Sequence, residues 1–204
     1  MKPTNEYELK YWQENKLLVG IDEAGRGPLA GPMVVAGVVF PMGYQSGEIN
    51  DSKQLTEKKR EELYDIIIKD ALYYRVEVVS PEEIDRINIL EADRKAMTEI
   101  ALSSGCDIIL TDAMDLYINK KVISIIKGDA KSCSIAAASI LAKVTRDHIM
   151  MEYDKIYPQY GFAKHKGYGT KQHLQALEEF GVTPIHRKSY RPVFEAMQPK
   201  LFDL

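Results

Sequence analysis

The sequence is poor in cysteine and lacks any long apolar run. Its two cysteines, Cys106 and Cys133, are too few for a disulfide framework and do not have the spacing of a zinc site. We therefore expect a reducing compartment and interpret both as small apolar residues. The N-terminal stretch has no apolar signal core, and no segment approaches the ~20 apolar residues of a membrane span. These absences predict a cytoplasmic protein with no membrane contact.

A strong excess of charge of either sign is also lacking, since the formal net charge is −3. This value excludes a protein whose whole surface is basic, so a polyanionic partner must be met by local patches, which occur near the C-terminal end. Apolar residues make up 45% and charged residues 28% of the chain, a balance typical of folded globular proteins. Because no repeat, low-complexity tract or linker divides the chain, we expect a single domain over residues 1–204.

Strand-length apolar runs alternate with helical patterns. Strands are expected at 17–21, 33–40, 71–79, 107–112 and 121–129. Helices are expected near the N-terminus, from a cap at Thr56, from a capping box of Ser80 and Glu83, over 89–103, over 134–158, and from a cap at Thr170 to Gly181. The segments 161–170 and 183–194 are interpreted as irregular. This order of elements predicts an α/β fold with a mixed sheet.

Acidic residues follow three of the expected strands. Asp22 and Glu23 stand just beyond the first strand, and Asp112 and Asp129 stand at the ends of the fourth and fifth. If these strands are neighbours, the carboxylates can converge, because open α/β sheets bind ligands beyond their strand ends. Such close carboxylates repel one another unless cations neutralise them or protons are taken up. Oxygen ligands without nearby His or Cys favour Mg²⁺ or Mn²⁺, and a pair of these ions can cleave a phosphodiester.

Each of these acids has a simpler interpretation when it is considered alone. An aspartate after a strand is often a helix cap or a turn former, and the glycines after Glu23 suit a plain tight turn. The occurrence of the acids as a group, with the sequence GRG attached to the first pair, favours a site over these alternatives.

The chain resembles bacterial ribonuclease HII in a series of motifs that occur in the family order. These motifs are DEAGRGPLAGPMVVAGVV, DSKQLT, INILEA, TDA, KGDAKSCSIAAASILAKVTRD and HKGYGT, and the similarity covers nearly the whole chain from Leu17 onward. The resemblance implies a ribonuclease H-like fold with a mixed central sheet flanked by helices. It implies a catalytic core over about 17–158 and a small C-terminal helical extension over about 159–204.

The same resemblance implies an activity and its acidic residues. The enzyme would be a metal-dependent endonuclease that cuts the RNA strand of RNA–DNA hybrids. It would also incise duplex DNA at single ribonucleotides, leaving 5′-phosphate and 3′-hydroxyl ends. Asp22, Glu23, Asp112 and Asp129 would be the catalytic carboxylates and would hold two Mn²⁺ or Mg²⁺ ions, with Asp22 and Asp112 as the best candidates for direct ligands.

Substrate contacts are also implied by the matched motifs. The backbone of Gly25, Arg26 and Gly27 would meet the ribose 2′-hydroxyl, and Tyr168 would stack on the sugar after the ribonucleotide. A packed loop tyrosine is the ordinary alternative for Tyr168. Phosphate contacts are expected from basic residues, which could equally be solvated charges: Lys53, Lys143, Arg146, His165, Lys166 and Lys171. Three serines could donate to phosphate or pack and cap: Ser132, Ser134 and Ser139.

Competing functions and partners follow from the same motifs. A binding module without catalysis is disfavoured, because carboxylates without metal would repel phosphate. Ribonuclease HIII shares the acids but normally carries an extra N-terminal domain, for which a strand from Leu17 leaves no room. A phosphotransferase would want a GxxxxGK[ST] loop, which is absent. We expect a monomer that acts on RNA–DNA hybrids and ribonucleotide-containing duplex DNA, with Leu201 and Phe202 as either a sliding-clamp tail or a docking segment.

Overall fold

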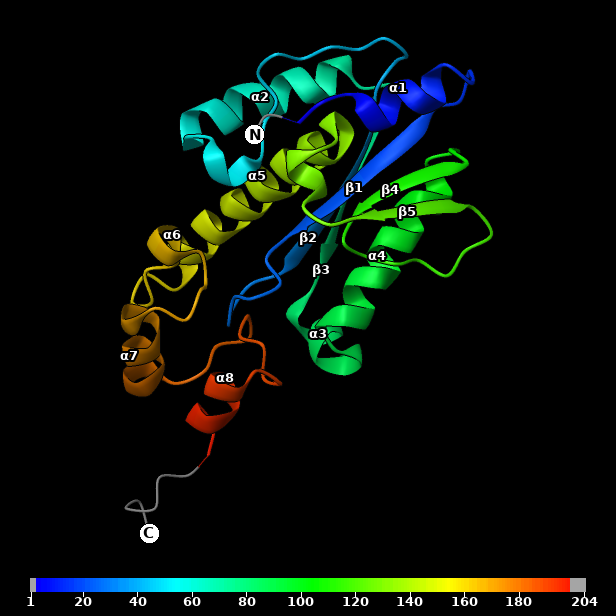
Figure 1. The fold of residues 1–204 in the computed structure, drawn as a ribbon. Helices are drawn as coiled ribbons and strands as arrows, with labels where there is room; N and C mark the ends of the chain where they lie inside the picture. Colours follow the sequence, from blue (N-terminus) through cyan, green and yellow to red (C-terminus); the bar gives the residue numbers. More distant parts are fainter. Residues whose placement is uncertain (1–2, 199–204) are drawn as a thin grey trace.

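A mixed five-stranded sheet forms the centre of the computed structural model, which describes residues 3–198 (Figure 1). The strands are β1 (Leu18–Ala24), β2 (Met33–Val39), β3 (Tyr73–Val79), β4 (Ile108–Asp112) and β5 (Lys121–Ile125). They lie in the order β3-β2-β1-β4-β5. β1 pairs antiparallel with β2 and parallel with β4, β2 pairs antiparallel with β3, and β4 pairs parallel with β5. The predicted mixed α/β sheet is confirmed.

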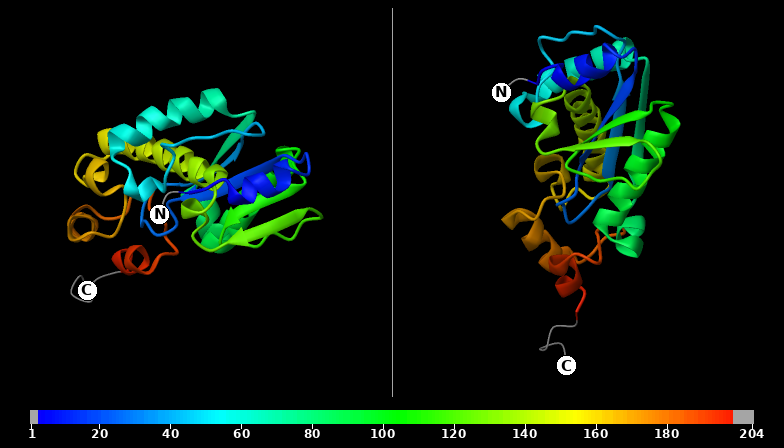
Figure 2. Two further views of the ribbon diagram at one scale, coloured as in Figure 1. Left: turned by 45° about the horizontal axis from the view of Figure 1, so that its top comes forward. Right: turned by 45° about the vertical axis from the view of Figure 1, so that its right-hand side comes forward.

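Helices cover both faces of this sheet. They are α1 (Glu6–Trp12), α2 (Glu57–Asp70), α3 (Pro81–Ile87), α4 (Ile89–Ser103), α5 (Cys133–Ile156), α6 (Phe162–His165), α7 (Lys171–Phe180) and α8 (Arg191–Ala196), with 3-10 turns η1 (Ser52–Gln54) and η2 (Gly128–Ala130). α3 and α4 pack on one face, whereas α1, α2 and α5 pack on the other (Figure 2). Three predicted caps are confirmed, since the side chains of Thr56, Ser80 and Thr170 accept backbone N–H bonds.

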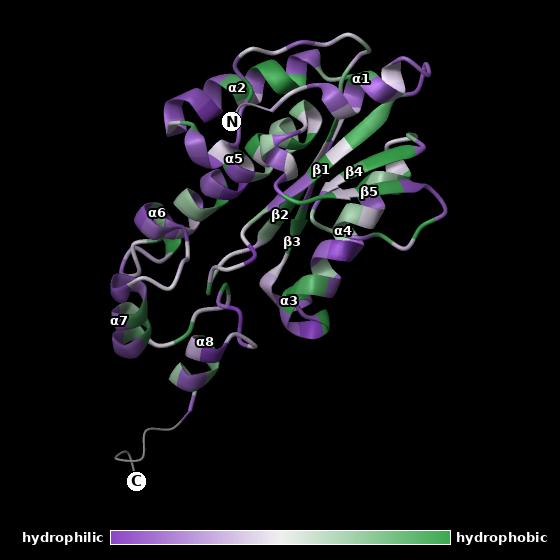
Figure 3. Cartoon of the chain, viewed as in Figure 1, coloured by the Kyte–Doolittle hydropathy of each residue, from purple (hydrophilic) through white to green (hydrophobic). Residues whose placement is uncertain are grey.

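Apolar residues line the strands and one side of each covering helix (Figure 3). α5 lies close to β1 because Gly20 of β1 has no side chain and faces the backbone of Ser134 and Ile135 at the start of α5. A Cβ on Gly20 would lie 2.4 Å from the carbonyl carbon of Ser134, which excludes any larger residue. Because side chains alternate along a strand, Asp22 projects toward α5 as Gly20 does. Among the described residues, no helix has both the length and the apolar character to cross a membrane.

Some element boundaries differ from the sequence-based expectation. β1 runs to Ala24, so Asp22 and Glu23 lie within the strand, because Ala24 still pairs with Val34 of β2. β5 ends at Ile125, which leaves Asp129 in η2 and not at a strand end. The segments predicted as irregular contain α6 and α8, and Pro192 in the first turn of α8 suits a helix start because its fixed φ is helical.

α6, α7 and α8 lie together near the C-terminal end of α5, away from the sheet (Figure 1). Met150 of α5 packs there with Ala30, Tyr160 and Phe162, which joins this C-terminal segment to the turn after β1. An isolated bridge between Ala30 and His186 links the same two regions. The C-terminal helices therefore contact the loop that follows the first acidic pair.

Candidate active site

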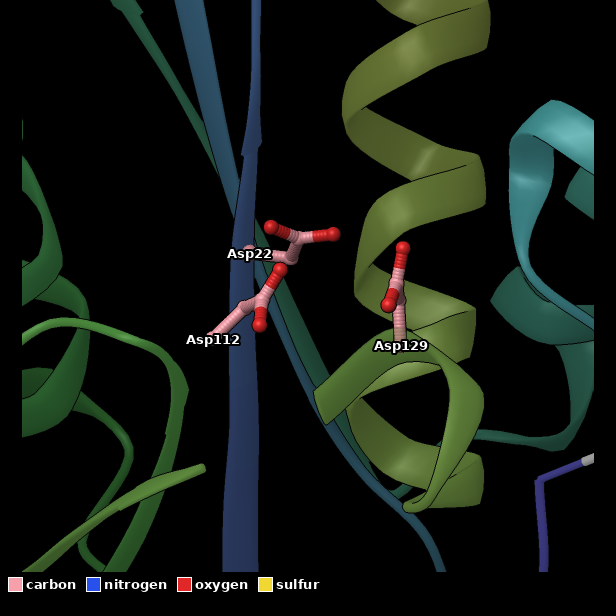
Figure 4. A group of neighbouring side chains, drawn as sticks. All are labelled: Asp22, Asp112 and Asp129. Atoms are coloured by element: carbon pink, nitrogen blue, oxygen red, sulfur yellow. The ribbon is translucent and has the colours of Figure 1, made fainter. Parts of the chain in front are cut away.

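Three aspartates from separate parts of the chain meet beside α5 (Figure 4). One carboxylate oxygen from each of Asp22, Asp112 and Asp129 lies within 4.8 Å of the other two. Asp22 and Asp112 are neighbours because Ile21 pairs with Thr111 in the parallel β1–β4 ladder. Asp112 Oδ1 accepts the Gly128 amide at 2.8 Å, which holds η2 and brings Asp129 close. The convergence predicted from the sequence is confirmed for these three acids.

Glu23 faces the other side of β1, since successive side chains of a strand alternate. Arg26 lies between Glu23 and a second acid: its NH1 is 3.8 Å from Glu23 Oε1, and its Nε is 3.6 Å from Asp93 Oδ2. Asp93, from α4, is fully buried, and within residues 3–198 neither of its carboxylate oxygens accepts a hydrogen bond. The sequence interpretation missed Asp93. Its signal was an acid on the buried side of the helix that carries Ala96 and Met97.

Burial and mutual repulsion raise the pKa values of these acids. Burial raises the pKa of Asp22 well above its ordinary value, and the charges of Glu23 and Asp112 raise it further. Burial, followed by the charge of Asp93, raises the pKa of Glu23 to about 8. Burial also raises the pKa of Asp93 to about 7 and that of Asp112 above its usual range. The fully ionised cluster is thus unfavourable without positive charge.

The donor set of the three aspartates fits a hard divalent cation. All three donors are carboxylate oxygens, and among the described residues the group contains no His or Cys ligand. Oxygen ligands of this kind suit Mg²⁺ and Mn²⁺ better than zinc. A cation would also offset the repulsion that raises the pKa values of Asp22 and Asp112. Lys53 already supplies one nearby positive charge, with its Nζ 3.4 Å from Asp129 Oδ2.

A cleft of about 390 Å³ adjoins the acids. Glu23 and the turn of Gly25, Arg26 and Gly27 line one side of it, and Tyr168 lines it as well. The Tyr168 ring is about half exposed and lies over the Arg146 guanidinium, 5.9 Å from ring centroid to Cζ. Three of the predicted basic contacts, Lys53, Lys143 and Arg146, also line the cleft. The structure thus gathers the predicted substrate residues around one opening.

The two glycines of the GRG turn have different surroundings. Gly25 has a φ of +99°, and a Cβ there would lie 2.1 Å from Arg146 Nε, so the fold itself requires glycine. A Cβ on Gly27 would meet only the Tyr168 ring, at an ordinary 3.7 Å. The protein therefore leaves the Gly27 side of the turn open to a ligand, whereas Gly25 is needed for packing.

Two buried arginines hold the turn from behind. Arg146, which is 1% exposed, donates to the carbonyls of Ala30, Pro32 and Lys166. Arg187, which is fully buried, donates to the carbonyls of Gly25, Arg26 and Gly31. Arg146 thus stabilises the turn, and its expected contact with phosphate stays a prediction. Arg187 was missed, because its basic segment gives no local sign of which carbonyls it meets.

The remaining basic residues differ in whether their side chains are free to contact a ligand. Lys143 is half-buried and pairs with Asp147 at 2.7 Å, while Lys171 is exposed at the start of α7. His165 is buried and bonds to backbone groups, and Lys166 Nζ donates to the Ala163 carbonyl, so neither extends toward the cleft as a free cation.

The predicted serines serve mainly as caps and packing groups. Ser132 caps α5 and donates to the buried carboxylate of Glu8, and Ser134 is fully buried. Ser139 lies 2.9 Å from the hydroxyl of Ser52 beside the cleft. Packing and capping, rather than phosphate contact, is therefore the role of Ser132 and Ser134.

Comparison with known proteins finds one consistent family. The family described as Ribonuclease HII matches residues 19–196. Ribonuclease HII of Lactobacillus helveticus is 52% identical over 189 residues, which cover 92% of this chain and 76% of that protein. Ribonuclease HII of Ruminiclostridium cellulolyticum is 56% identical over 176 residues, covering 85% and 69%.

Solved structures agree with these sequence matches. Ribonuclease H2 from Pyrococcus horikoshii OT3 has a TM-score of 0.77 and 30% identity, covering 88% of this chain and 96% of that one. A chain in the PCNA:RNase HII complex from Archaeoglobus fulgidus has a TM-score of 0.73 and 29% identity, covering 92% and 100%. The predicted ribonuclease H-like fold is confirmed.

Proposed function

Because the chain belongs to the ribonuclease HII family, we propose that it incises duplex DNA at single embedded ribonucleotides and leaves 5′-phosphate and 3′-hydroxyl ends. The family assignment makes the chain a ribonuclease H, a metal-dependent enzyme that hydrolyses the RNA strand of RNA–DNA hybrids. The observation that carries the finer proposal is the three-aspartate cluster beside a cleft whose turn exposes the backbone at Gly27.

In this proposal the acids would hold two Mg²⁺ or Mn²⁺ ions beside the reacting phosphodiester. Asp22, Asp112 and Asp129 supply the shared ligands, and Glu23 completes the site from the cleft side of β1. When bound, such ions supply a water nucleophile at neutral pH and stabilise negative charge on the leaving oxygen. The Gly128 amide keeps Asp112 in place, and Lys53 is positioned to attract the phosphate beside Asp129.

The cleft provides the recognition part of the proposal. The N–H groups of Arg26 and Gly27 have room to approach a sugar, because no Cβ stands on Gly27. Beside Gly27, the exposed ring of Tyr168 offers a flat surface for a deoxyribose or base. A hydroxyl that bonds to the backbone amides distinguishes ribose from deoxyribose, since only ribose carries a 2′-OH.

The test uses a duplex with one ribonucleotide, incubated with Mg²⁺ and with Mn²⁺ separately. Incision at the ribonucleotide, with ligatable 3′-hydroxyl ends, is expected from the wild type but not from Asp22→Asn. Cleavage of a long hybrid without incision of this duplex would limit the enzyme to hybrids. Binding of both duplexes without cleavage under either metal would instead favour a module that has lost catalysis.

Partner binding and assembly form a separate part of the proposal. The Archaeoglobus fulgidus relative is seen in a complex with PCNA, and we propose that a sliding clamp also binds this chain through its tail. The tail residues Leu201 and Phe202 lie outside the described residues. A monomer in solution remains a prediction, which sedimentation would check, and loss of clamp binding on deleting residues 199–204 would check the tail.

A further inference from the structure

The two walls of the cleft are held by neighbouring residues of the C-terminal segment. Residues 185–187 run beside 29–31: the Gly31 amide donates to the Ile185 carbonyl, and the Arg187 amide donates to the Leu29 carbonyl. From this short ladder, the side chain of Arg187 reaches the GRG turn, and the side chain of His186 reaches His173, which in turn bonds to the Tyr168 carbonyl. Both walls therefore depend on one dipeptide.

Arg187 fixes the peptide planes of the GRG turn. Its NH2 donates to the Gly25 carbonyl at 2.6 Å and its NH1 to the Arg26 carbonyl at 2.9 Å. Tyr190 Oη also donates to the Arg26 carbonyl, at 2.5 Å. In a trans peptide the carbonyl and the following N–H point in opposite directions. Arg187 therefore turns the N–H groups of Arg26 and Gly27 away from itself.

Within residues 3–198, those two amides have no acceptor. Across residues 3–198, neither the Arg26 N–H nor the Gly27 N–H donates a hydrogen bond to another group, although both residues line the cleft. The Arg187 guanidinium is fully buried, and most of its hydrogen bonds are donated to backbone carbonyls. A planar fork of donors is suited to holding several carbonyls at once in a fixed arrangement.

His186 holds the wall formed by Tyr168 through a second histidine. The Thr183 amide donates to His186 Nδ1 at 3.0 Å, so the proton of a neutral His186 must be on Nε2. That Nε2 lies 3.0 Å from His173 Nε2, which must accept. The proton of His173 is then on Nδ1, 3.0 Å from the Tyr168 carbonyl that accepts it.

Burial supports the neutral form of both rings. It lowers the pKa of His173 and that of His186 to about 4. One proton therefore occupies each ring near neutral pH, and the chain of donors runs in a single direction from Thr183 to Tyr168. His165 stacks on His173, and the Tyr160 ring contacts both histidines. Glu82, Asp85 and Lys188 line a pocket together with His186.

We propose that His186 and Arg187 are positioning residues that align the two walls of the cleft and so set its preference for a ribonucleotide over a deoxyribonucleotide. The inference rests on the proposed function, because it assigns the free amides of Arg26 and Gly27 to the ribose hydroxyl. Arg187 aims these amides, and His186 fixes the tautomer with which His173 holds the Tyr168 backbone.

The first experiment compares Arg187→Lys with Arg191→Lys. Lysine keeps the charge but cannot donate to several carbonyls in one plane. Arg191 is exposed, and in the described part of the chain its ion pair is with Glu195 alone, so its variant is the matched control. Two quantities are measured: kcat/KM on a single-ribonucleotide duplex, and the Ki of the same duplex made only of DNA as a competitive inhibitor. The all-DNA duplex reports phosphate contacts alone.

Arg187→Lys is expected to lower kcat/KM about tenfold while the Ki changes less than about twofold, because a misdirected hydrogen-bond donor costs roughly that much. Arg191→Lys is expected to leave both values unchanged. Since Arg187 is buried, a milder variant guards against misfolding. Tyr190→Phe removes one bond to the Arg26 carbonyl and should lower kcat/KM by about threefold with the same unchanged Ki.

The role of His173 in holding Tyr168 is tested by two variants, in which asparagine or glutamine replaces His173. Asparagine places an N–H where His173 Nδ1 is and needs no tautomer to be fixed, whereas glutamine places its amide near the Nε2 position. His173→Asn should therefore stay within about twofold of wild type, and His173→Gln should lose about fivefold in kcat/KM. A purely structural histidine would make the two variants equal.

Two outcomes would overturn the inference. One is a wild-type kcat/KM in each of Arg187→Lys, Tyr190→Phe and His173→Gln. The other is a fall in kcat/KM that is matched by weaker binding of the all-DNA duplex and by a lower melting temperature. Failure of the proposed function is distinct, because the wild type itself would then cut a long hybrid but not the single-ribonucleotide duplex, and the inference would fall with it.

Discussion

Replacing Asp112 by asparagine should separate the metal-binding role of the aspartate cluster from its structural role. Asparagine keeps the Oδ1 acceptor for the Gly128 amide, so η2 and Asp129 should stay in place. The substitution removes one of the three charges that meet within 4.8 Å. We therefore expect the metal-free variant to be at least as stable as the wild type, because repulsion with Asp22 is relieved.

The size of the effect follows from linkage between metal binding and folding. An ion present at a hundred times its dissociation constant stabilises the folded state by about 2.7 kcal/mol. For a chain of this length, 1 kcal/mol moves the melting temperature by roughly 2–4 °C. The wild type should thus gain about 5–11 °C on saturation with Mn²⁺ or Mg²⁺. Asp112→Asn should lose most of this gain, because a neutral amide is a weaker ligand for a hard cation.

Thermal unfolding with increasing metal, recorded in parallel for wild type and variant, measures this difference. Asp107→Asn is the matched control, since Asp107 is exposed and precedes the opposite end of β4. The control should show the wild-type gain. Equal metal-dependent gains in wild type and Asp112→Asn would refute the reasoning that Asp112 is a ligand, and a large loss of stability in the metal-free variant would refute the structural part.

Further predictions concern the cleft and the buried acids. Tyr168→Ala should reduce incision at a single ribonucleotide while Tyr168→Phe retains it, because stacking requires the flat ring and not the hydroxyl. Tyr168 lines the cleft, and equal rates for all three proteins in an incision assay would remove it from the site. Gly25→Ala should lower the free energy of unfolding by about 1–3 kcal/mol in chemical denaturation, because Gly25 has a positive φ. Gly27→Ala should keep the wild-type stability but lose activity. A stable Gly25→Ala protein and an unstable Gly27→Ala protein would contradict the different surroundings of the two glycines. Folding raises the pKa of Asp93 to about 7 and that of Glu23 to about 8. The stability that protonation gives to the metal-free protein is therefore complete below the ordinary values near 4 and is lost as pH rises through 7 and 8. Unfolding by denaturant from about pH 5 to 9 should show this fall, and Asp93→Asn should flatten it; a wild-type curve that rises over this range would contradict the assigned direction.

Local signals in the sequence determined most of the secondary structure. Thr56, Ser80 and Thr170 cap helices as their side chains predict, because a cap depends only on residues three positions away. The helix at 89–103 has the predicted limits, and the β-branched runs form the strands of the sheet. The matched motifs likewise indicated the family and its acids, since these residues occur in short, ordered stretches.

Tertiary structure alone decided how these elements form a site. The parallel β1–β4 pairing puts Asp22 beside Asp112, and the turn after β5 brings Asp129 to them, although the sequence separates these acids widely. Pairing with β2 extended β1 through Glu23, so strand alternation placed Glu23 and Asp22 on opposite faces. The roles of Arg146 and Arg187 were equally hidden. A buried guanidinium is satisfied by whichever carbonyls the fold brings within reach. Apart from the Lys166 carbonyl, the carbonyls that these two arginines meet are more than a hundred residues away along the chain.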